Sequence, residues 1–116
     1  MARLPWRVRD RATFERLRRS PLRARRGPLS VTWVPAADAL VAEGDQPRVA
    51  FAIGRRVGTA VARNRLRRRL RAALAEADLA PGSYLVAAGP EAARLSWAEL
   101  RSTLADVLTV LAERRR

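Results

Sequence analysis

Residues 55–71 limit most strongly how this chain can fold, because eight of these 17 residues are arginine and none is acidic. If residues 59–77 are helical, apolar residues recur at the i, i+4 and i+7/i+8 spacing of one buried stripe. The stripe consists of Ala62, Leu66, Leu70, Ala73, Leu74 and Ala77. The arginines then cover the rest of the surface, with Arg63 and Arg69 flanking the stripe. We therefore predict a helix with one side on a core, and the remainder of the chain can be read as its support.

The basic side of this helix repels itself. Five arginine pairs lie three or four residues apart, which costs the free helix roughly 0.2–0.5 kcal/mol per pair and about 1–2.5 kcal/mol in total. The pairs are Arg63–Arg67, Arg67–Arg71, Arg65–Arg69, Arg65–Arg68 and Arg68–Arg71. Arg63 also lies in the first turn, where the helix dipole disfavours a cation. Phosphates would replace this repulsion with charge-assisted hydrogen bonds, so the pattern favours nucleic-acid binding over a merely solvated face.

Composition restricts the class of protein further. At 116 residues the chain is long enough for one domain, and 48% hydrophobic residues argue against disorder despite a net charge of +13. That charge implies an acidic partner. All 24 basic residues are arginine, which indicates a compositional bias. The positive charge is therefore evidence about the partner, whereas the choice of arginine over lysine is not. No apolar run reaches the ~18 residues of a membrane span and no signal peptide is visible, so we expect a soluble, cytoplasmic protein without a membrane partner.

The first half of the chain reads as a helix followed by strands. Asp10 is a candidate N-cap for a short helix over residues 11–19, and residues 22–28 are expected to form a basic loop. Alternating apolar residues predict strands over 29–34 and 48–53, joined by an acidic connection as a hairpin-like pair. Residues 55–57 are expected to form a turn or short strand that leads into the arginine helix, with Thr59 as its cap.

The second half reads as a strand and a final helix. Pro81-Gly82 closes the arginine helix region, and residues 83–88 form an apolar strand, which completes a strand–helix–strand unit. Ser96 and Glu99 form a capping box that opens the last helix. Its expected core stripe is Trp97, Leu100, Leu104, Val107, Leu108 and Leu111.

The chain shows no catalytic constellation. Histidine and cysteine are absent, which removes the commonest general base, disulfides and thiolate chemistry. The eleven carboxylates are scattered, and no phosphate-binding glycine loop or metal-ligand cluster is visible. A nuclease with its own active site is therefore disfavoured.

With these features described, residues 62–71 (ARNRLRRRLR), preceded by residues 55–61 (RRVGTAV), resemble the RNR signature of the family of bacterial ribonuclease P protein components. The resemblance extends over about residues 7–111. It implies a mixed α/β (α+β) two-layer sandwich in the order α-β-β-β-α-β-α, like a ribosomal-protein domain, with a left-handed βαβ crossover. We expect a single domain over residues 1–116, with residues 1–8 and 112–116 as flexible basic tails.

The resemblance also implies a function. The protein would be the non-catalytic subunit of an endoribonuclease that removes the 5′ leader from precursor tRNA. Ribonuclease P RNA would carry the active site and its Mg²⁺ ions, so no cofactor is expected on the protein and no DNA partner either. The alternative is a general RNA-binding or ribosomal-type chaperone without a nuclease role. A DNA-reading helix is disfavoured, because strand and turn, and not a first helix, precede the arginine helix.

Two sets of residues match positions that bind RNA in the family. Those expected to face the catalytic RNA are Arg63, Asn64, Arg65, Arg67, Arg68 and Arg71. Those expected to line the leader cleft are Phe14, Arg18, Trp33, Phe51, Arg55 and Arg56. Arg18 stands where family members often have a second aromatic residue, and Trp33 can lie in the cleft or in the core. Phe14 can likewise be read as a core anchor or as a residue that stacks a base.

Overall fold

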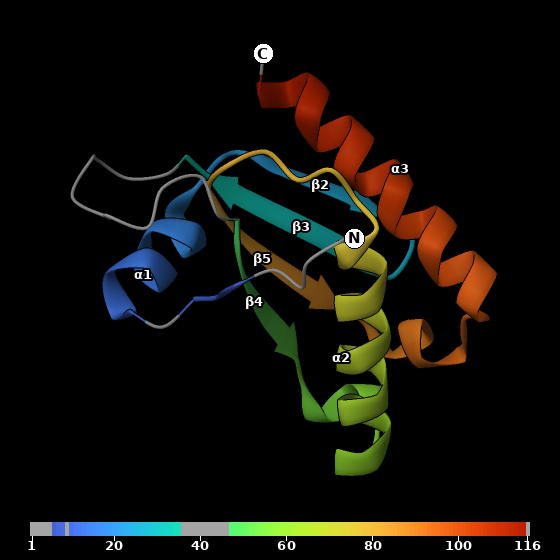
Figure 1. Ribbon diagram of the computed structural model, residues 1–116. Helices are drawn as coiled ribbons and strands as arrows, with labels where there is room; N and C mark the ends of the chain where they lie inside the picture. The colour runs from blue at the N-terminus through green and yellow to red at the C-terminus, as the bar shows by residue number, and fades with distance from the viewer. Residues whose placement is uncertain (1–5, 9, 36–46, 116) are drawn as a thin grey trace.

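The computed structural model describes residues 6–8, 10–35 and 47–115. Its five-stranded sheet has the order β1-β4-β5-β3-β2 (Figure 1). The elements are β1 (Trp6–Arg7), α1 (Arg11–Arg19), β2 (Arg23–Arg26), β3 (Leu29–Val34), β4 (Arg48–Ile53), the 3-10 turn η1 (Arg55–Val57), α2 (Ala60–Ala75), β5 (Ser83–Ala88), the 3-10 turn η2 (Pro90–Arg94) and α3 (Trp97–Arg115). The predicted mixed fold and its α-β-β-β-α-β-α order are confirmed, with the short β1 added in front.

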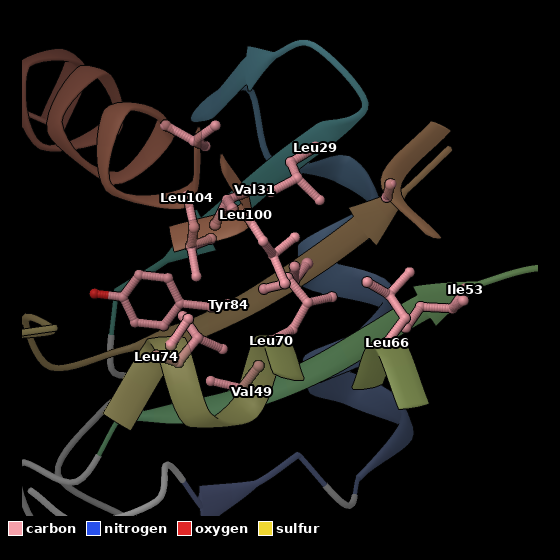
Figure 2. Packing of buried hydrophobic residues seen from close by; sticks show 14 of the residues in the cluster. Leu29, Val31, Val49, Ile53, Leu66, Leu70, Leu74, Tyr84, Leu100 and Leu104 are labelled. Carbon is pink, nitrogen blue, oxygen red and sulfur yellow. The ribbon is translucent and has the colours of Figure 1, made fainter. Parts of the chain in front are cut away.

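Helices cover the two faces of the sheet unequally. Figure 1 shows α2 and α3 on one face, which we call the helical face, and α1 on the other, which we call the α1 face. The larger buried cluster lies on the helical face, and Figure 2 shows Leu66, Leu70 and Leu74 of α2 pointing toward the sheet. The smaller cluster gathers Val8, Leu17, Val34 and Ala50 beneath α1. Much of the α1 face is therefore left open.

The first and last helices, α1 and α3, begin at the expected caps. Asp10 accepts a hydrogen bond from the backbone N–H of Thr13 at 2.9 Å. At α3, the Ser96 N–H donates to Glu99 Oε1 at 2.8 Å, and the Glu99 N–H donates to Ser96 Oγ at 3.1 Å. These reciprocal bonds satisfy N–H groups that the first helical turn leaves without a partner. Both predicted caps are confirmed.

The apolar stripes of α2 and α3 are largely confirmed. In α2 the fully buried members are Leu66, Leu70, Ala73 and Leu74, and in α3 they are Leu100, Leu104, Val107 and Leu111. Trp97, predicted to belong to the buried stripe of α3, is 37% exposed. No helix in the described part of the chain is long and apolar enough to cross a membrane.

The pairing of the strands corrects the predicted hairpin. β3 and β4 are not neighbours, since β5 lies between them, antiparallel to β3 and parallel to β4. The parallel pair confirms the strand–helix–strand unit around α2. Alternation along a strand indicates which side is buried and does not indicate which strand lies beside it. The predicted connection over residues 36–47 lies, except for Pro47, outside the described residues.

Two further segments differ from the prediction. Residues 23–26, expected in a loop, form strand β2, which pairs with β3 through a turn at Gly27 with φ of 52°. The sequence Arg-Ala-Arg-Arg holds a single apolar residue, the buried Ala24, so its strand signal is weak. Residues 55–57 form a 3-10 turn.

The expected tails are partly structured. Residues 112–115 belong to α3, where Arg114 donates to the Arg23 carbonyl and the guanidinium of Arg115 lies 5.0 Å from the centre of the Trp33 ring. Near the other end, residues 6 and 7 pair with β4, and the Val8 N–H donates to the Val49 carbonyl at 3.2 Å. These contacts anchor both segments to the sheet.

Candidate nucleic-acid interface

The outward side of α2 is a continuous basic surface. Thr59 caps the helix by accepting from the Ala62 N–H at 3.1 Å, and the 16 residues that follow contain no acid. Asn64, Arg65 and Arg68 are exposed, and the other predicted members, Arg63, Arg67 and Arg71, are half-buried. The structure therefore brings all six predicted residues onto one helix surface.

Contacts within α2 relieve little of its charge. Arg67 donates to Asn64 Oδ1 at 2.7 Å, which orders one guanidinium without neutralising it. The Nε of Arg63 is buried and has no hydrogen-bond partner among the residues that the structure describes. An unsatisfied buried donor of this kind costs on the order of 1–3 kcal/mol. The α2 surface thus has donors and charge in excess of what the described residues satisfy.

One flank of α2 reaches over the edge of the sheet. A pocket of about 310 Å³, which we call the edge pocket, is lined there by Phe14 of α1, Ala50 and Phe51 of β4, and Arg67 and Arg71 of α2, with Arg7, Val8 and Val49. The guanidinium of Arg71 lies 6.0 Å from the centre of the Phe51 ring. Two residues predicted for the leader cleft therefore adjoin two predicted for the catalytic RNA.

The open α1 face carries a row of small and polar side chains. Strand register places Arg25 opposite Ser30, Ser30 opposite Ala87, and Ala87 opposite Ala52. Such residues leave the backbone accessible, because their side chains are short. Ser30 and Ala87 of this row form the floor of an open groove, and Arg25 of β2 lies at its basic rim.

This groove, which we call the sheet groove, has a volume of about 850 Å³. Its lining residues are Arg23, Arg25, Gly27, Pro28, Ser30, Gly54, Arg56, Val57, Ala87, Ala88, Gly89, Pro90 and Glu91. Arg23 is oriented by a hydrogen bond from its Nε to Thr32 Oγ1 at 3.2 Å. The groove therefore combines three arginines with an uncluttered floor.

Sequence reasoning missed the contribution of β2 to this site. Arg23 and Arg25 alternate with the buried Ala24, and this alternation was the available signal for a strand with one basic side. Arg56 lines the groove as predicted, and Arg55 is exposed on the same turn without lining it. The exposed Arg18 stands on α1 with its Nη1 3.8 Å from Glu15 Oε1.

Trp33 does not lie in this site. Its side chain packs on the helical face, where its Nε1 donates to the Pro81 carbonyl at 3.1 Å and Arg115 covers its ring. Alternation along β3 places Trp33 on the same side as Leu29 and Val31 and opposite Thr32. Of the two positions that the sequence left open for Trp33, cleft or core, the structure has it packed against the core of the helical face.

Acidic groups are sparse around the two grooves. In the described ranges no group of three or more acidic, histidine or cysteine side chains could hold a metal ion. Among the described residues that line the sheet groove and the edge pocket, Glu91 is the one acid. The arrangement can bind an anionic chain but offers no carboxylate cluster for Mg²⁺.

Comparison with known proteins agrees with this geometry. Residues 4–112 match the family model described as Ribonuclease P. The ribonuclease P protein component of Thermus thermophilus is 44% identical over 92 residues, which cover 78% of this chain and 50% of that protein. That of Brucella suis is 36% identical over 117 residues, covering 94% of this chain and 82% of that protein. The chain spans about half the length of its Thermus relatives.

Solved structures show the same fold. The RNase P protein of Staphylococcus aureus superposes with a TM-score of 0.76 at 20% identity, covering 90% of this chain and 94% of that one. The RNase P protein of Thermotoga maritima gives a TM-score of 0.75 at 18% identity, covering 90% and 96%. Together with the family match over nearly the whole chain, these likenesses show that the chain belongs to the ribonuclease P protein family.

Proposed function

We propose that this chain is the protein subunit of a ribonuclease P. It binds the catalytic RNA through α2 and the 5′ leader of precursor tRNA through the sheet groove and the edge pocket. The observation that carries the proposal is the acid-free arginine surface of α2, which lines the edge pocket and follows the η1 turn, whose Arg56 and Val57 line the sheet groove. Such a role implies the cytoplasm, where precursor tRNA is made.

Electrostatics supports the assignment of α2 to the larger RNA. Its like-charged pairs destabilise the free helix, and each phosphate placed among them would reverse part of that cost. RNA neutralised in this way also releases condensed counterions, which adds a favourable and salt-dependent contribution to binding. Arg65 and Arg68 are the most accessible of the paired arginines, so they would contact phosphates first.

The groove geometry favours a single strand as the second ligand. Neighbouring strands lie about 4.8 Å apart, so the four strands from β2 to β4 span about 14 Å. An extended leader can cross this floor with its phosphates toward Arg23, Arg25 and Arg56, while unpaired bases stack on aromatic residues such as Phe14. A ligand of this kind would let the enzyme bind precursor more tightly than mature tRNA.

The proposal places the chemistry on the RNA. The described side chains do not fit a Mg²⁺ site, because their carboxylates are not clustered, so we assign no metal to the protein. Its arginines would act by position and charge. They would lower the repulsion between RNA phosphates and so reduce the Mg²⁺ that the assembly needs.

Cleavage of a precursor tRNA at low Mg²⁺ tests the proposal. The reaction is run with protein alone, with a bacterial ribonuclease P RNA alone, and with both. We expect cleavage at the 5′ end of the tRNA in the mixture alone. Absence of stimulation by the protein would favour the general RNA-binding alternative, and cleavage by the protein alone would show an active site of its own.

Leader binding is tested separately with Phe14→Ala. Loss of one stacking contact is expected to weaken binding of a leader-bearing precursor by about 1–3 kcal/mol and to leave binding of mature tRNA unchanged. Trp33→Phe, on the opposite face of the sheet, is the matched control and should change neither affinity. An equal loss for precursor and mature tRNA would contradict the assignment of the groove.

A further inference from the structure

Trp97 is the first residue of α3 and stays 37% exposed although its stripe neighbours are buried. Two guanidinium groups flank its indole ring. That of Arg101, one turn later in α3, lies 5.7 Å from the ring centre, and that of Arg69 in α2 lies 6.0 Å away. The three side chains bridge the two helices on the flank of α2 that faces away from the edge pocket.

The two arginines are held differently. Arg101 is bound to Glu76, the C-cap residue of α2. Its Nη2 lies 2.7 Å from Glu76 Oε2, and its Nε donates to the same oxygen at 2.9 Å. Arg69 contacts no acidic side chain among the residues that the structure describes. Arg101 is thus a fixed cation beside the indole, whereas Arg69 can rotate about its side-chain bonds.

The cluster continues the basic surface of α2. Arg69 stands four residues after Arg65, so their side chains neighbour one another on the helix. An RNA strand bound along Arg65 and Arg68 would therefore reach Arg69 and then Trp97. Both guanidinium carbons lie within the ~6 Å of the ring centre at which a cation attracts an aromatic face, and rotation of Arg69 about its side-chain bonds would make room for a base on the indole.

We propose that Arg69, Trp97 and Arg101 form a stacking platform for one unpaired nucleotide of the RNA that binds α2. The base stacks on the indole and a flanking phosphate pairs with the guanidinium of Arg69, while Arg101, already paired with Glu76, borders the ring. This inference rests on the proposed function, because it assumes that RNA lies along α2. It extends the interface from α2 onto α3, a helix whose sequence pattern indicates core packing alone.

Tryptophan fluorescence tests the platform directly. A protein that keeps Trp97 as its one tryptophan (Trp6→Phe, Trp33→Phe) is titrated with a bacterial ribonuclease P RNA. We expect saturable quenching, because a stacked base contacts the indole. The matched control keeps Trp33 instead (Trp6→Phe, Trp97→Phe) and should show little quenching, since Trp33 is covered by Arg115.

Affinity separates recognition from a purely structural role. Trp97→Ala is expected to weaken binding of the same RNA about fivefold or more, and Trp97→Phe to retain most of the affinity. Circular dichroism and urea unfolding of each variant show that the folded protein is being compared. Quenching confined to Trp97, together with the loss in Trp97→Ala, supports the platform.

The outcomes distinguish this inference from the proposed function. If wild-type protein stimulates cleavage but Trp97 is not quenched, or if Trp97→Ala binds RNA like wild type, the platform is wrong and the function stands. If wild-type protein neither binds the RNA nor stimulates cleavage, both are overturned. Binding without stimulation, with Trp97 quenched, keeps the platform and moves the protein to the general RNA-binding class.

Discussion

Replacing Arg65 and Arg68 with glutamine is expected to stabilise the fold and weaken RNA binding at the same time. Both side chains are exposed on α2, and they take part in the pairs Arg65–Arg68, Arg65–Arg69 and Arg68–Arg71. Each like-charged pair costs about 0.2–0.5 kcal/mol, so the free energy of unfolding should rise by about 0.6–1.5 kcal/mol. Urea unfolding of the free protein at low ionic strength measures this gain.

The same substitutions should change the salt dependence of binding. Each phosphate contact contributes about 0.7–0.9 to the slope of log affinity against log salt concentration, so loss of two contacts should lower the slope by about 1.4–1.8. Filter binding or anisotropy with ribonuclease P RNA over a range of salt concentrations gives the slope. Arg114→Gln, which removes one positive charge near the distant end of α3, is the control and should leave the slope unchanged.

The prediction is strict because it requires stability to rise while RNA affinity falls. A general loss of structure would lower both stability and affinity, and a solvated face would change stability alone. An unchanged affinity and slope in the Arg65→Gln/Arg68→Gln protein would therefore refute the assignment of α2 to RNA. A loss of stability would refute the claim that its arginines repel one another in the free protein.

Three other substitutions test how the fold supports the site. Gly82→Ala should destabilise the protein by more than about 1 kcal/mol, because its φ is 131° and a Cβ would overlap Trp33 Nε1, whereas Gly54→Ala, with open space around it, is the control; thermal unfolding compares the two. Asp10→Ala should cost about 0.5–2 kcal/mol at neutral pH through loss of the α1 cap. Hydrogen bonds from Thr13 lower the pKa of Asp10, so the contribution of Asp10 to stability is complete above the ordinary value of 3.8 and is lost as pH falls through the lower folded-state pKa. Urea unfolding at several pH values should show that the difference between wild type and Asp10→Ala disappears in that range. Arg63→Met should raise stability by about 1 kcal/mol by removing the unpartnered buried Nε, yet weaken RNA binding, and an unchanged unfolding free energy would show that this nitrogen is satisfied in solution.

Local pattern determined the elements that carry the basic surface. The apolar stripe from Leu66 to Leu74 predicts α2, and the absence of acidic residues from that helix predicts an anionic partner. Both features could be read from the sequence because they depend on residues within a few helical turns of one another. The caps at Asp10, Thr59 and Ser96 are equally local, since each hydrogen bond closes within three residues. These features, and the family resemblance, needed the sequence alone.

The arrangement of the site needed the tertiary structure. Insertion of β5 between β3 and β4 places Ala87 beside Ser30 in the floor of the sheet groove, and pairing of β2 brings Arg25 to its rim. Strand alternation groups Trp33 with Leu29 and Val31 but does not indicate which elements cover that side, so it could predict neither the groove nor the contact of Trp33 with Arg115. Trp97 shows the same limit on a helix: its spacing suits the core, but the place where α3 crosses α2 leaves it at the surface between two arginines. The sequence thus determined which residues form the helices, their caps and their buried stripes, and long-range packing decided which residues lie side by side.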